Sequence, residues 1–243
     1  MSAPISIVIP TLNAGQELPS TLQSLMEGLQ QGLIRELIVS DAGSDDHTLE
    51  IADEAGARIV SGAPSRGGQL RRGCAEAKAD WLLILHADTE LQPGWTAAVA
   101  EHLNTGQPAA FRLRFRAKGV APLWVAGWAN LRSRLFGLPY GDQGLLVQRQ
   151  TYLSAGGYPD QPLMEDVALV RALPRSVLLK ANAVTNAERY IRQGWFRRDA
   201  RNLWTLARYF LGADPAKLAK AYRGYRRCAV QQWTCRGETG PQN

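Results

Sequence analysis

Three groups of carboxylate residues lie at positions in the sequence where they could bind a cation or accept a proton. They are Asp41 with Asp45 and Asp46, Asp88 alone, and Glu165 with Asp166. Carboxylate oxygens bind hard divalent cations, and a carboxylate can also accept a proton from a hydroxyl group. Each group has a simpler explanation, because acidic side chains favour helix N-termini by ~0.3 to 1 kcal/mol. Their joint placement at the starts of predicted loops and helices nevertheless favours a shared site.

The stretch 81–90 predicts how one of these acids is positioned. Residues 81–85 are mostly apolar and run directly into a polar cluster that contains Ala87 and Asp88. This is the pattern of a buried strand that ends at a ligand-binding sheet edge. We therefore expect Asp88 at the mouth of a crevice, separated by a short turn from a helix that 93–95 open. The alternative is that Asp88 merely caps that helix.

The segments around this stretch repeat a strand-then-helix unit. The predicted strands are 5–9, 36–40, 58–60 and 81–85, and the predicted intervening helices are 18–29, 48–55 and 69–78. Four such units in succession predict a parallel sheet with right-handed crossovers. The loops that follow the strands should then gather along one edge of the sheet.

Beyond Glu90 the pattern changes. Residues 109–116 alternate apolar and basic side chains, which predicts a more exposed strand compatible with antiparallel pairing. Further predicted elements are a Trp-rich helix around 124–135, a strand at 144–147, a helix at 149–155, a helix from 165, an amphipathic Arg-rich helix around 203–211 and a last helix from 214 to about 230. We expect an α/β domain at 1–188, with a mostly parallel sheet flanked by helices, and a C-terminal helical extension at 189–243 packed on it.

Composition limits the functional classes. Lys and Arg number 28 against 22 Asp and Glu, so the net charge of +6 suggests an anionic partner, whether nucleic acid, a membrane surface or a phosphorylated molecule. The three cysteines, Cys74, Cys228 and Cys235, have neither disulfide-framework nor zinc-site spacing. Neither a signal peptide nor a membrane span is evident. These features predict a cytoplasmic protein that is soluble or peripheral to the inner face of the membrane.

The residues favour the prediction that this protein is a nucleotide-dependent enzyme. A sheet-edge site for a diphosphate needs a partner for the base, a metal anchor and cationic donors, and Asp41, Asp88 and Arg66 could supply these in turn. The neighbouring Gly67 and Gly68 favour approach of the backbone to a phosphate. Kinase, GTPase and dinucleotide functions are disfavoured, because neither a Walker loop nor Gly-x-Gly-x-x-Gly follows the first strand.

Four motifs in this order resemble family 2 glycosyltransferases with the GT-A (Rossmann-like) fold, over roughly residues 5–180. They are IVIPTLN at 7–13, VSDAGSDDHT at 39–48, LHADT at 85–89 and MED at 164–166. The segments 65–70 and 209–215 resemble more narrowly a small bacterial subgroup associated with radical-SAM or arsenosugar biosynthesis clusters.

The resemblance implies a nucleotide-diphosphate sugar as donor. Pro10, Thr11, Asn13 and Asp41 would surround the nucleoside, with Asp41 hydrogen-bonded to the base. Arg66 would lie near the phosphates. The acceptor would be a hydroxyl of a small or lipid-linked molecule.

The resemblance also implies roles for the later acids. Asp88 matches the last acid of the family's Asp-x-Asp motif, which ligates Mg²⁺ or Mn²⁺ at the diphosphate, while Ala87 beside it lies against the donor. His86 replaces the first acid of that motif, so it is either a ligand or a hydrogen-bond partner of one. Asp166 matches the catalytic base of an inverting enzyme, and Glu165 orients the acceptor or supports Asp166.

The Arg-rich and aromatic C-terminal segment has three interpretations: a solvated helix face, a cover over the substrates, or a contact with anionic lipid. We assign Arg192 and Trp195 to substrate contact. The residues that suggest lipid contact are Trp204, Tyr209 and Phe210 beside Arg198, Arg201 and Arg208.

Two other functions compete with glycosyl transfer. A sugar nucleotidyltransferase shares the sheet and the metal acids, but 13–16 lack the basic residue usual in its glycine-rich loop. A non-catalytic nucleic-acid-binding protein is suggested by the charge and the C-terminal segment, although we expect no nucleic-acid partner. The motifs predict the reaction class but not the donor base, the sugar, the acceptor or the oligomeric state.

Overall fold

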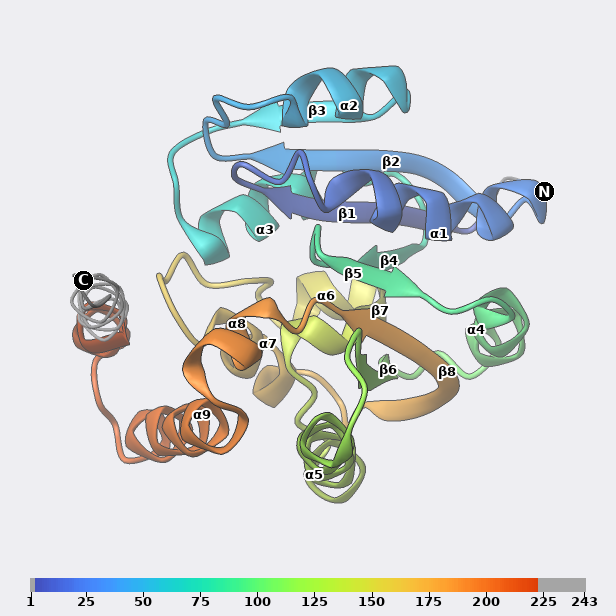
Figure 1. The fold of residues 1–243 in the computed structure, drawn as a ribbon. Coiled ribbons are helices and arrows are strands. Elements are labelled where there is room, and N and C mark those ends of the chain that lie inside the picture. Colours follow the sequence, from blue (N-terminus) through green and yellow to red (C-terminus); the bar gives the residue numbers. More distant parts are fainter. Residues whose placement is uncertain (1–2, 223–243) are drawn as a thin grey trace, which may run out of the picture.

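A computed structural model describes residues 3–222, which form one sheet with helices on both faces (Figure 1). The strands are β1 (Ile5–Thr11), β2 (Ile34–Asp41), β3 (Arg58–Ser61), β4 (Trp81–Ile84), β5 (Thr89–Leu91), β6 (Ala109–Phe115), β7 (Leu145–Gln148) and β8 (Val177–Thr185). The α-helices are α1 (Leu18–Gln30), α2 (Thr48–Glu54), α3 (Arg66–Ala75), α4 (Trp95–Leu103), α5 (Val120–Phe136), α6 (Arg149–Ser154), α7 (Glu165–Ala172), α8 (Glu188–Gln193) and α9 (Trp195–Phe210), with a 3-10 turn η1 (Gly141–Gln143). Residues 215–222 are also helical.

The predicted parallel half of the sheet is confirmed. The strand order is β3-β2-β1-β4-β7-β6-β8-β5, and β1 to β4 pair in parallel. β7 then runs antiparallel to β4 and to β6, whereas β6 is parallel to β8. The carboxyl ends of β1 and β2 coincide, because Thr11 is in register with Asp41.

The alternation of side chains along β1 explains why both sheet faces are covered. Ile5, Ile7 and Ile9 point into a core shared with α1 and α4, and Val8 points into a second core shared with α3, α6 and α7. Successive strand residues face opposite sides, so a strand that is buried on both faces is apolar throughout.

Two strands, β5 and β8, were not predicted from the sequence. The expectation of a short turn between Asp88 and the next helix is wrong, because β5 lies there and pairs antiparallel with β8. β8 itself was not predicted, although its side chains alternate between buried and more exposed positions. The helix predicted at 69–78 instead begins at Arg66 and ends at Ala75.

The C-terminal helices lie at one end of the molecule, where α9 packs beside α5 and the chain then turns back toward α3 (Figure 1). The end of the predicted last helix, Cys228, Cys235 and the other residues after 222 lie outside the described residues. In the part that is described, no helix has the length and apolar character needed to cross a bilayer.

Candidate active site

Asp41 ends β2 with a buried carboxylate that is saturated by hydrogen bonds. Its Oδ1 accepts from Thr11 Oγ1 at 2.8 Å and from Ser44 Oγ at 2.5 Å, and its Oδ2 accepts from the backbone N–H groups of Gly43 at 2.7 Å and Ser44 at 2.8 Å. Burial alone would raise the pKa of Asp41, but the hydrogen bonds from Ser44, Thr11 and Gly43 lower it. Asp41 therefore stays ionised and holds the loop after β2 in shape. A nucleobase could bond to Asp41 only by replacing one of these hydrogen-bond donors.

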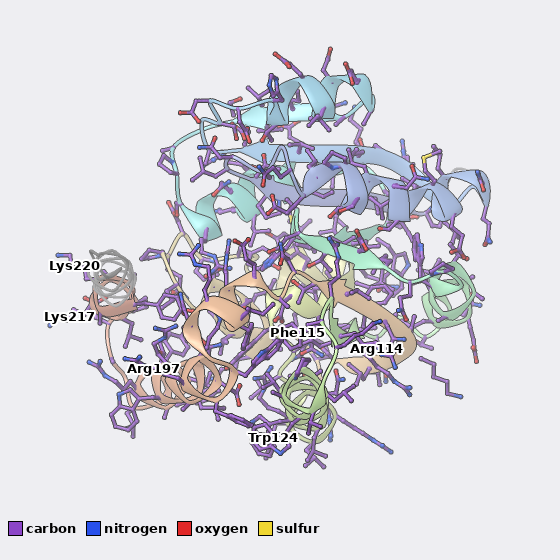
Figure 2. All side chains as sticks on the ribbon, viewed as in Figure 1. Arg114, Phe115, Trp124, Arg197, Lys217 and Lys220 are labelled. Atoms are coloured by element: carbon purple, nitrogen blue, oxygen red, sulfur yellow. The ribbon has the colours of Figure 1, made fainter. Side chains whose placement is uncertain are left out.

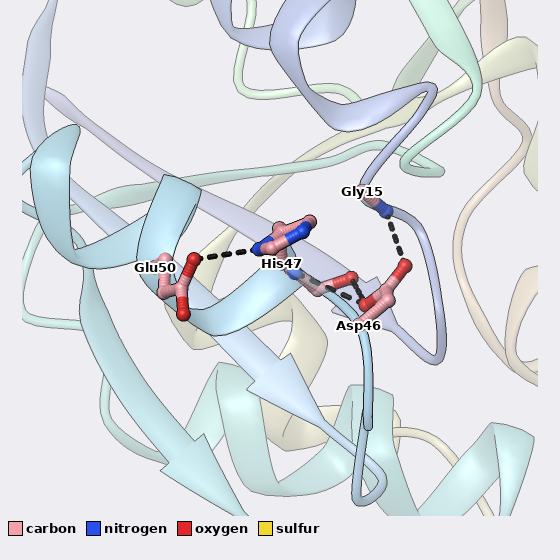
Figure 3. A network of polar contacts seen from close by, with 5 residues as sticks. Gly15, Asp46, His47 and Glu50 are labelled. Carbon is pink, nitrogen blue, oxygen red and sulfur yellow. Dashed lines mark hydrogen bonds and ion pairs between the residues drawn. The ribbon is translucent and has the colours of Figure 1, made fainter.

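The loops after β1 and β2 are tied together by reciprocal hydrogen bonds. Asn13 N donates to Ser44 Oγ at 2.9 Å, and Asn13 Oδ1 accepts from Asp45 N at 3.0 Å. Asp46 Oδ2 accepts from Gly15 N at 2.9 Å (Figure 3). Asn13 adopts a left-handed backbone with φ 51°, which asparagine tolerates better than most residues. Asp46 thus acts in the structure as a loop tie.

His47 and Glu50 form a separate ion pair beside this tie. His47 Nδ1 lies 2.7 Å from Glu50 Oε2, and both side chains are exposed (Figure 3). The hydrogen bond and charge of Glu50 raise the pKa of His47. The pair sits on the outer side of α2 and supplies no group to the sheet edge.

Asp88 lies in the turn after β4, as predicted. The turn is held by Thr21 Oγ1, which donates to the carbonyl of Ala87 at 2.7 Å, and by Asn186 N, which donates to the carbonyl of Asp88 at 3.2 Å. Asn186 directly follows β8, so the segment that leads into α8 reaches the same sheet edge. The Asp88 carboxylate is half-buried and makes no hydrogen bond that fixes it elsewhere in the described residues.

Asp166 lies in the first turn of α7, beside the turn at Gly141. Its Oδ2 accepts from Gly141 N at 2.9 Å. Only glycine fits at 141, because an added Cβ would lie 2.6 Å from His86 Nε2. His86, Gly141 and Asp166 are therefore neighbours, although they come from three distant segments.

Glu165 points the other way and is buried. Its Oε1 pairs with Arg66 Nε at 3.1 Å, and its Oε2 is buried without a hydrogen-bond partner in the described structure. Burial raises the pKa of Glu165, while Arg66 opposes the rise and the charge of Asp166 adds to it. Arg66 is half-exposed, so its other guanidinium nitrogens remain accessible to a ligand.

Asp88 and Asp166, which belong to two of the three acidic groups, both act on the pKa of His86, whereas Asp41 is engaged by its own loop. Burial lowers the pKa of His86, Arg66 lowers it further, and the charges of Asp88 and Asp166 oppose the shift. Both of these acids also help to raise the pKa of Asp142 to about 6, after the larger effect of burial. Asp88 follows His86 by two residues, and Asp166 is hydrogen-bonded to Gly141, which lies against His86, so the two acids lie near one imidazole ring.

Sequence reasoning assigned no role to several residues of this site. Asp142 Oδ1 and the Tyr140 hydroxyl are buried without hydrogen bonds in the described structure. The Arg132 guanidinium stacks 3.6 Å from the centre of the Tyr140 ring. Arg189, at the start of α8, lowers the pKa of His86 and so adds a cation nearby. The sequence feature that could have indicated this cluster is the Gly-Asp pair at 141–142, which lies in a predicted loop.

The prediction that Gly67 and Gly68 let the backbone approach a phosphate is wrong. A Cβ on Gly67 would lie 1.9 Å from the carbonyl oxygen of Pro159, and one on Gly68 would lie 2.9 Å from Asp160 Oδ1. Gly67 N also donates to the carbonyl of Gln161 at 3.2 Å. These glycines thus admit the 159–161 loop rather than a phosphate, and that contact brings Arg66 to Glu165.

The remaining predicted contacts occupy varied environments. Pro10 is half-buried at the end of β1, and Arg192 is exposed near the end of α8. Trp195 stacks on Tyr190 with 5.0 Å between ring centres and packs edge-on against Phe115. Trp195 is thus anchored in an aromatic cluster beneath α5, and its contact with substrate stays a prediction.

The residues at the sheet edge fit a cation that is held mainly by its substrate. No group of three or more His, Cys, Asp or Glu side chains in residues 3–222 could enclose an ion. Asp88 offers one accessible carboxylate, and His86 is kept neutral by its lowered pKa, as a metal ligand must be. Such a donor set suits Mg²⁺ or Mn²⁺ whose other ligands come from a diphosphate and water.

Comparison with known proteins decides the family. Residues 6–145, which include β1, β2, β4 and the Asp88 turn, match the sequence profile of glycosyl transferase family 2. The chain belongs to this family. The predicted family 2 glycosyltransferase domain is confirmed.

The curated relatives match this chain over part of their length only. A PGL/p-HBAD biosynthesis glycosyltransferase of Mycobacterium tuberculosis is 36% identical over 117 residues, which cover 44% of this chain and 45% of that protein. The glucosyl-3-phosphoglycerate synthase of M. tuberculosis is 36% identical over 93 residues, or 35% of this chain and 28% of that protein. The chain therefore matches less than half the length of these relatives.

Solved structures confirm the GT-A-like fold. The M. tuberculosis glucosyl-3-phosphoglycerate synthase in complex with Mn²⁺, UDP and phosphoglyceric acid has a TM-score of 0.52 and 25% identity, over 75% of this chain and 68% of that chain. Residues 1–349 of S. aureus TarS reach a TM-score of 0.59 at 14% identity, over 88% of this chain and 68% of that chain. The second likeness concerns the fold alone.

Proposed function

We propose that this chain transfers a sugar, with inversion, from a nucleoside-diphosphate sugar to an acceptor hydroxyl. The observation that carries the proposal is the contact of Gly141 with both Asp166 and His86, which brings Asp166 beside the segment that carries Asp88. The Asp88 carboxylate could bind a cation, and the Asp166 oxygens, which each accept one backbone N–H, from Gly141 and Val167, keep a lone pair for a proton. The name of one relative, glucosyl-3-phosphoglycerate synthase, supports a small acceptor, and a lipid-linked acceptor is the alternative.

Donor binding is assigned to the tied loops and the cations. Thr11, Asn13 and Pro10 line the end of β1 where the nucleoside would lie, and Asp41 would exchange its bond from Ser44 Oγ for one from the base. The accessible nitrogens of Arg66, together with Arg189, would face the phosphates, because guanidinium groups bind phosphate oxygens well. Ala87 offers no bulky side chain where the sugar would pass.

The reaction then needs only a proton acceptor and a leaving group. Asp166 takes the proton from the acceptor hydroxyl as that oxygen forms a bond to the anomeric carbon, and the bond from this carbon to the diphosphate oxygen breaks. Gly141 N holds the Asp166 carboxylate in place through its 2.9 Å hydrogen bond. A divalent cation held by Asp88, with His86 beside it, would neutralise the diphosphate that departs. Glu165 positions Arg66, and Arg192 and Trp195 would contact substrate.

A melting assay tests this function. UDP or GDP with Mn²⁺ should raise the Tm of the full chain, and the rise should vanish in EDTA, because ligand binding to the folded state stabilises it. Active nucleotide sugars should then release nucleoside diphosphate in the presence of an acceptor. Binding of single-stranded RNA with a steep salt dependence, and no shift by any nucleotide, would instead favour the nucleic-acid-binding alternative.

Two finer assignments belong to this proposal. On the resemblance of segments 65–70 and 209–215, we assign the chain to the small bacterial subgroup associated with radical-SAM or arsenosugar clusters. We also assign it to the cytoplasm.

The nucleotidyltransferase alternative predicts a different product. Release of pyrophosphate from a sugar phosphate and a nucleoside triphosphate, in place of nucleoside diphosphate release, would identify it.

A further inference from the structure

Helix α5 has apolar residues on two opposite sides. Val125, Ala126 and Ala129 pack into a core with β6. A second row is exposed to solvent and recurs at helical spacing, namely Val120, Leu123, Trp124, Leu131 and Leu135. A helix that is apolar all round is normally covered on every side, so this row marks a surface that something else covers.

Helix α9 extends the same surface. Phe196, Trp204 and Leu211 are exposed by 61%, 65% and 85%. The ring of Trp124 on α5 contacts the ring of Phe196 edge-on, with 5.4 Å between centres. The contact between Trp124 and Phe196 thus joins the exposed apolar residues of the two helices, and we call them together the α5/α9 face. It lies at the end of the molecule where Trp124 is labelled (Figure 2).

The exposed charged residues on α5 and α9 have one sign. Asp199 is the single acid in the sequences of α5 and α9, and it is buried. Lys118, Arg134 and Arg197 are exposed. An apolar face with tryptophans and a cationic border is the pattern of helices that lie in the interface of an anionic bilayer.

A hollow opens at the end of this face, between the C-terminal ends of α5, α7 and α9. It has a volume of about 360 Å³, and its lining includes Leu135, Phe136 and Phe210 together with Arg171 and Arg175. Arg171 stacks 5.0 Å from the centre of the Phe210 ring. Arg175 Nη2 already donates to the carbonyl oxygens of Arg134 and Leu135 at 2.8 and 2.9 Å, so the hollow offers a lipid apolar walls with Arg171 as the cation beside them.

We propose that the α5/α9 face docks on an anionic lipid surface. A second copy of the chain is a poorer occupant, because pairing two such faces would bring the cationic borders of both copies together. The docking does not depend on the proposed reaction, since none of the α5/α9 face residues contributes to the sheet-edge site.

Vesicle co-sedimentation of the full chain tests this inference. The wild type should bind vesicles of phosphatidylcholine mixed with phosphatidylglycerol and bind phosphatidylcholine alone much less. A double variant, Leu123→Glu with Trp204→Glu, should lose binding by about tenfold or more, since it places charge in the apolar layer. The matched control is Leu29→Glu with Leu153→Glu, whose leucines are also more than half exposed but lie on α1 and α6; it should bind like the wild type.

A second variant keeps the test independent of folding. Arg134→Glu with Arg197→Glu leaves the apolar face intact and should lose the preference for anionic lipid, while its Tm stays near that of the wild type. The proposal is overturned by binding that ignores lipid charge, or by equal losses in the Leu29 and Leu153 control. It is also overturned if the wild type fails to bind vesicles and forms a dimer in solution that the Leu123 and Trp204 variant abolishes.

Discussion

Glu165 and Asp166 are adjacent in the sequence but face different surroundings. Glu165 is 2% exposed and paired with Arg66, whereas Asp166 is half-buried and held by Gly141 N beside His86. Adjacent residues in the first turn of a helix point about 100° apart, so one faces the core while the other faces solvent. The geometry thus separates a buried residue that is paired with Arg66 from the residue that we propose as the proton acceptor.

Replacing Asp166 by asparagine should remove the base and keep the shape. We expect turnover to fall by ~10² to 10⁴, the usual contribution of general base catalysis, while nucleoside diphosphate with Mn²⁺ still raises the Tm. Glu101→Gln, an exposed acid on α4, is the control and should keep wild-type turnover. Full activity in Asp166→Asn would refute the assignment of the base.

Asp142 predicts a specific dependence of stability on pH. Burial raises its pKa from 3.8 to about 6, so the folded protein binds this proton more tightly than the unfolded chain. The stabilisation is complete below pH about 4 and is lost as the pH rises toward 6. Asp142→Asn cannot ionise, so its stability relative to the wild type should increase over this range by about 1 to 3 kcal/mol and then level off. Urea denaturation across this pH range measures the difference, and a difference that shrinks with rising pH would contradict the cause.

At the scale of elements, the first turn of α3 is fixed by a loop far along the chain. Ser65 Oγ caps the helix and also donates to Asp160 Oδ1 at 2.5 Å. Gly67 contacts the backbone of Pro159 and Gln161 at the same place. The N-terminus of α3 and the segment before α7 therefore form one unit, and the Arg66–Glu165 ion pair spans it.

Two glycine-to-alanine changes in helices separate close packing from helix propensity. Gly67→Ala should destabilise the fold by roughly 1 to 3 kcal/mol or more, since the new methyl group overlaps the Pro159 carbonyl. Gly127→Ala on α5 meets nothing within 4 Å and should stabilise by about 0.5 to 1 kcal/mol. Chemical denaturation of both variants measures the contrast. Equal stabilities would mean that the α3 contact is looser than the structure has it.

At the scale of the whole molecule, the last described helix covers the acidic motif. Leu218 and Ala219 are buried against Leu163, and Met164 packs at the edge of this cluster. Met164 has a left-handed backbone with φ 63° immediately before Glu165. Residues 215–222 thus help to hold an unusual conformation next to the proposed base.

Leu218→Ala should loosen this cover. Truncation of a buried leucine costs about 2 to 5 kcal/mol in a core, so we expect the helix to detach locally and the amides of α7 to exchange faster. Hydrogen exchange of residues 164–172 measures the effect. Lys217→Ala, at an exposed neighbouring position, should leave exchange unchanged, and unchanged exchange in Leu218→Ala would show that the cover does not support α7.

The sequence predicted the parts of this fold that local patterns encode. The strand predicted at 81–85 is β4, and Asp88 lies in the turn after it as expected, because an apolar run followed by polar residues is visible within ten positions. The role of Gly67 was misjudged and β5 was missed, because both depend on segments about 90 residues away. Asp142 gave only a weak signal, since its burial comes from tertiary packing around Arg132 and the cleft.

The position of β8 has a consequence for the order in which this chain can fold. β8 lies between β6 and β5 and is the partner that pairs with β5. During synthesis, β1 to β4 can pair as they leave the ribosome, whereas β5 must wait for β8 to emerge. Until then the nascent protein carries an unpaired edge directly after the Asp88 turn, which is where a chaperone would be expected to bind.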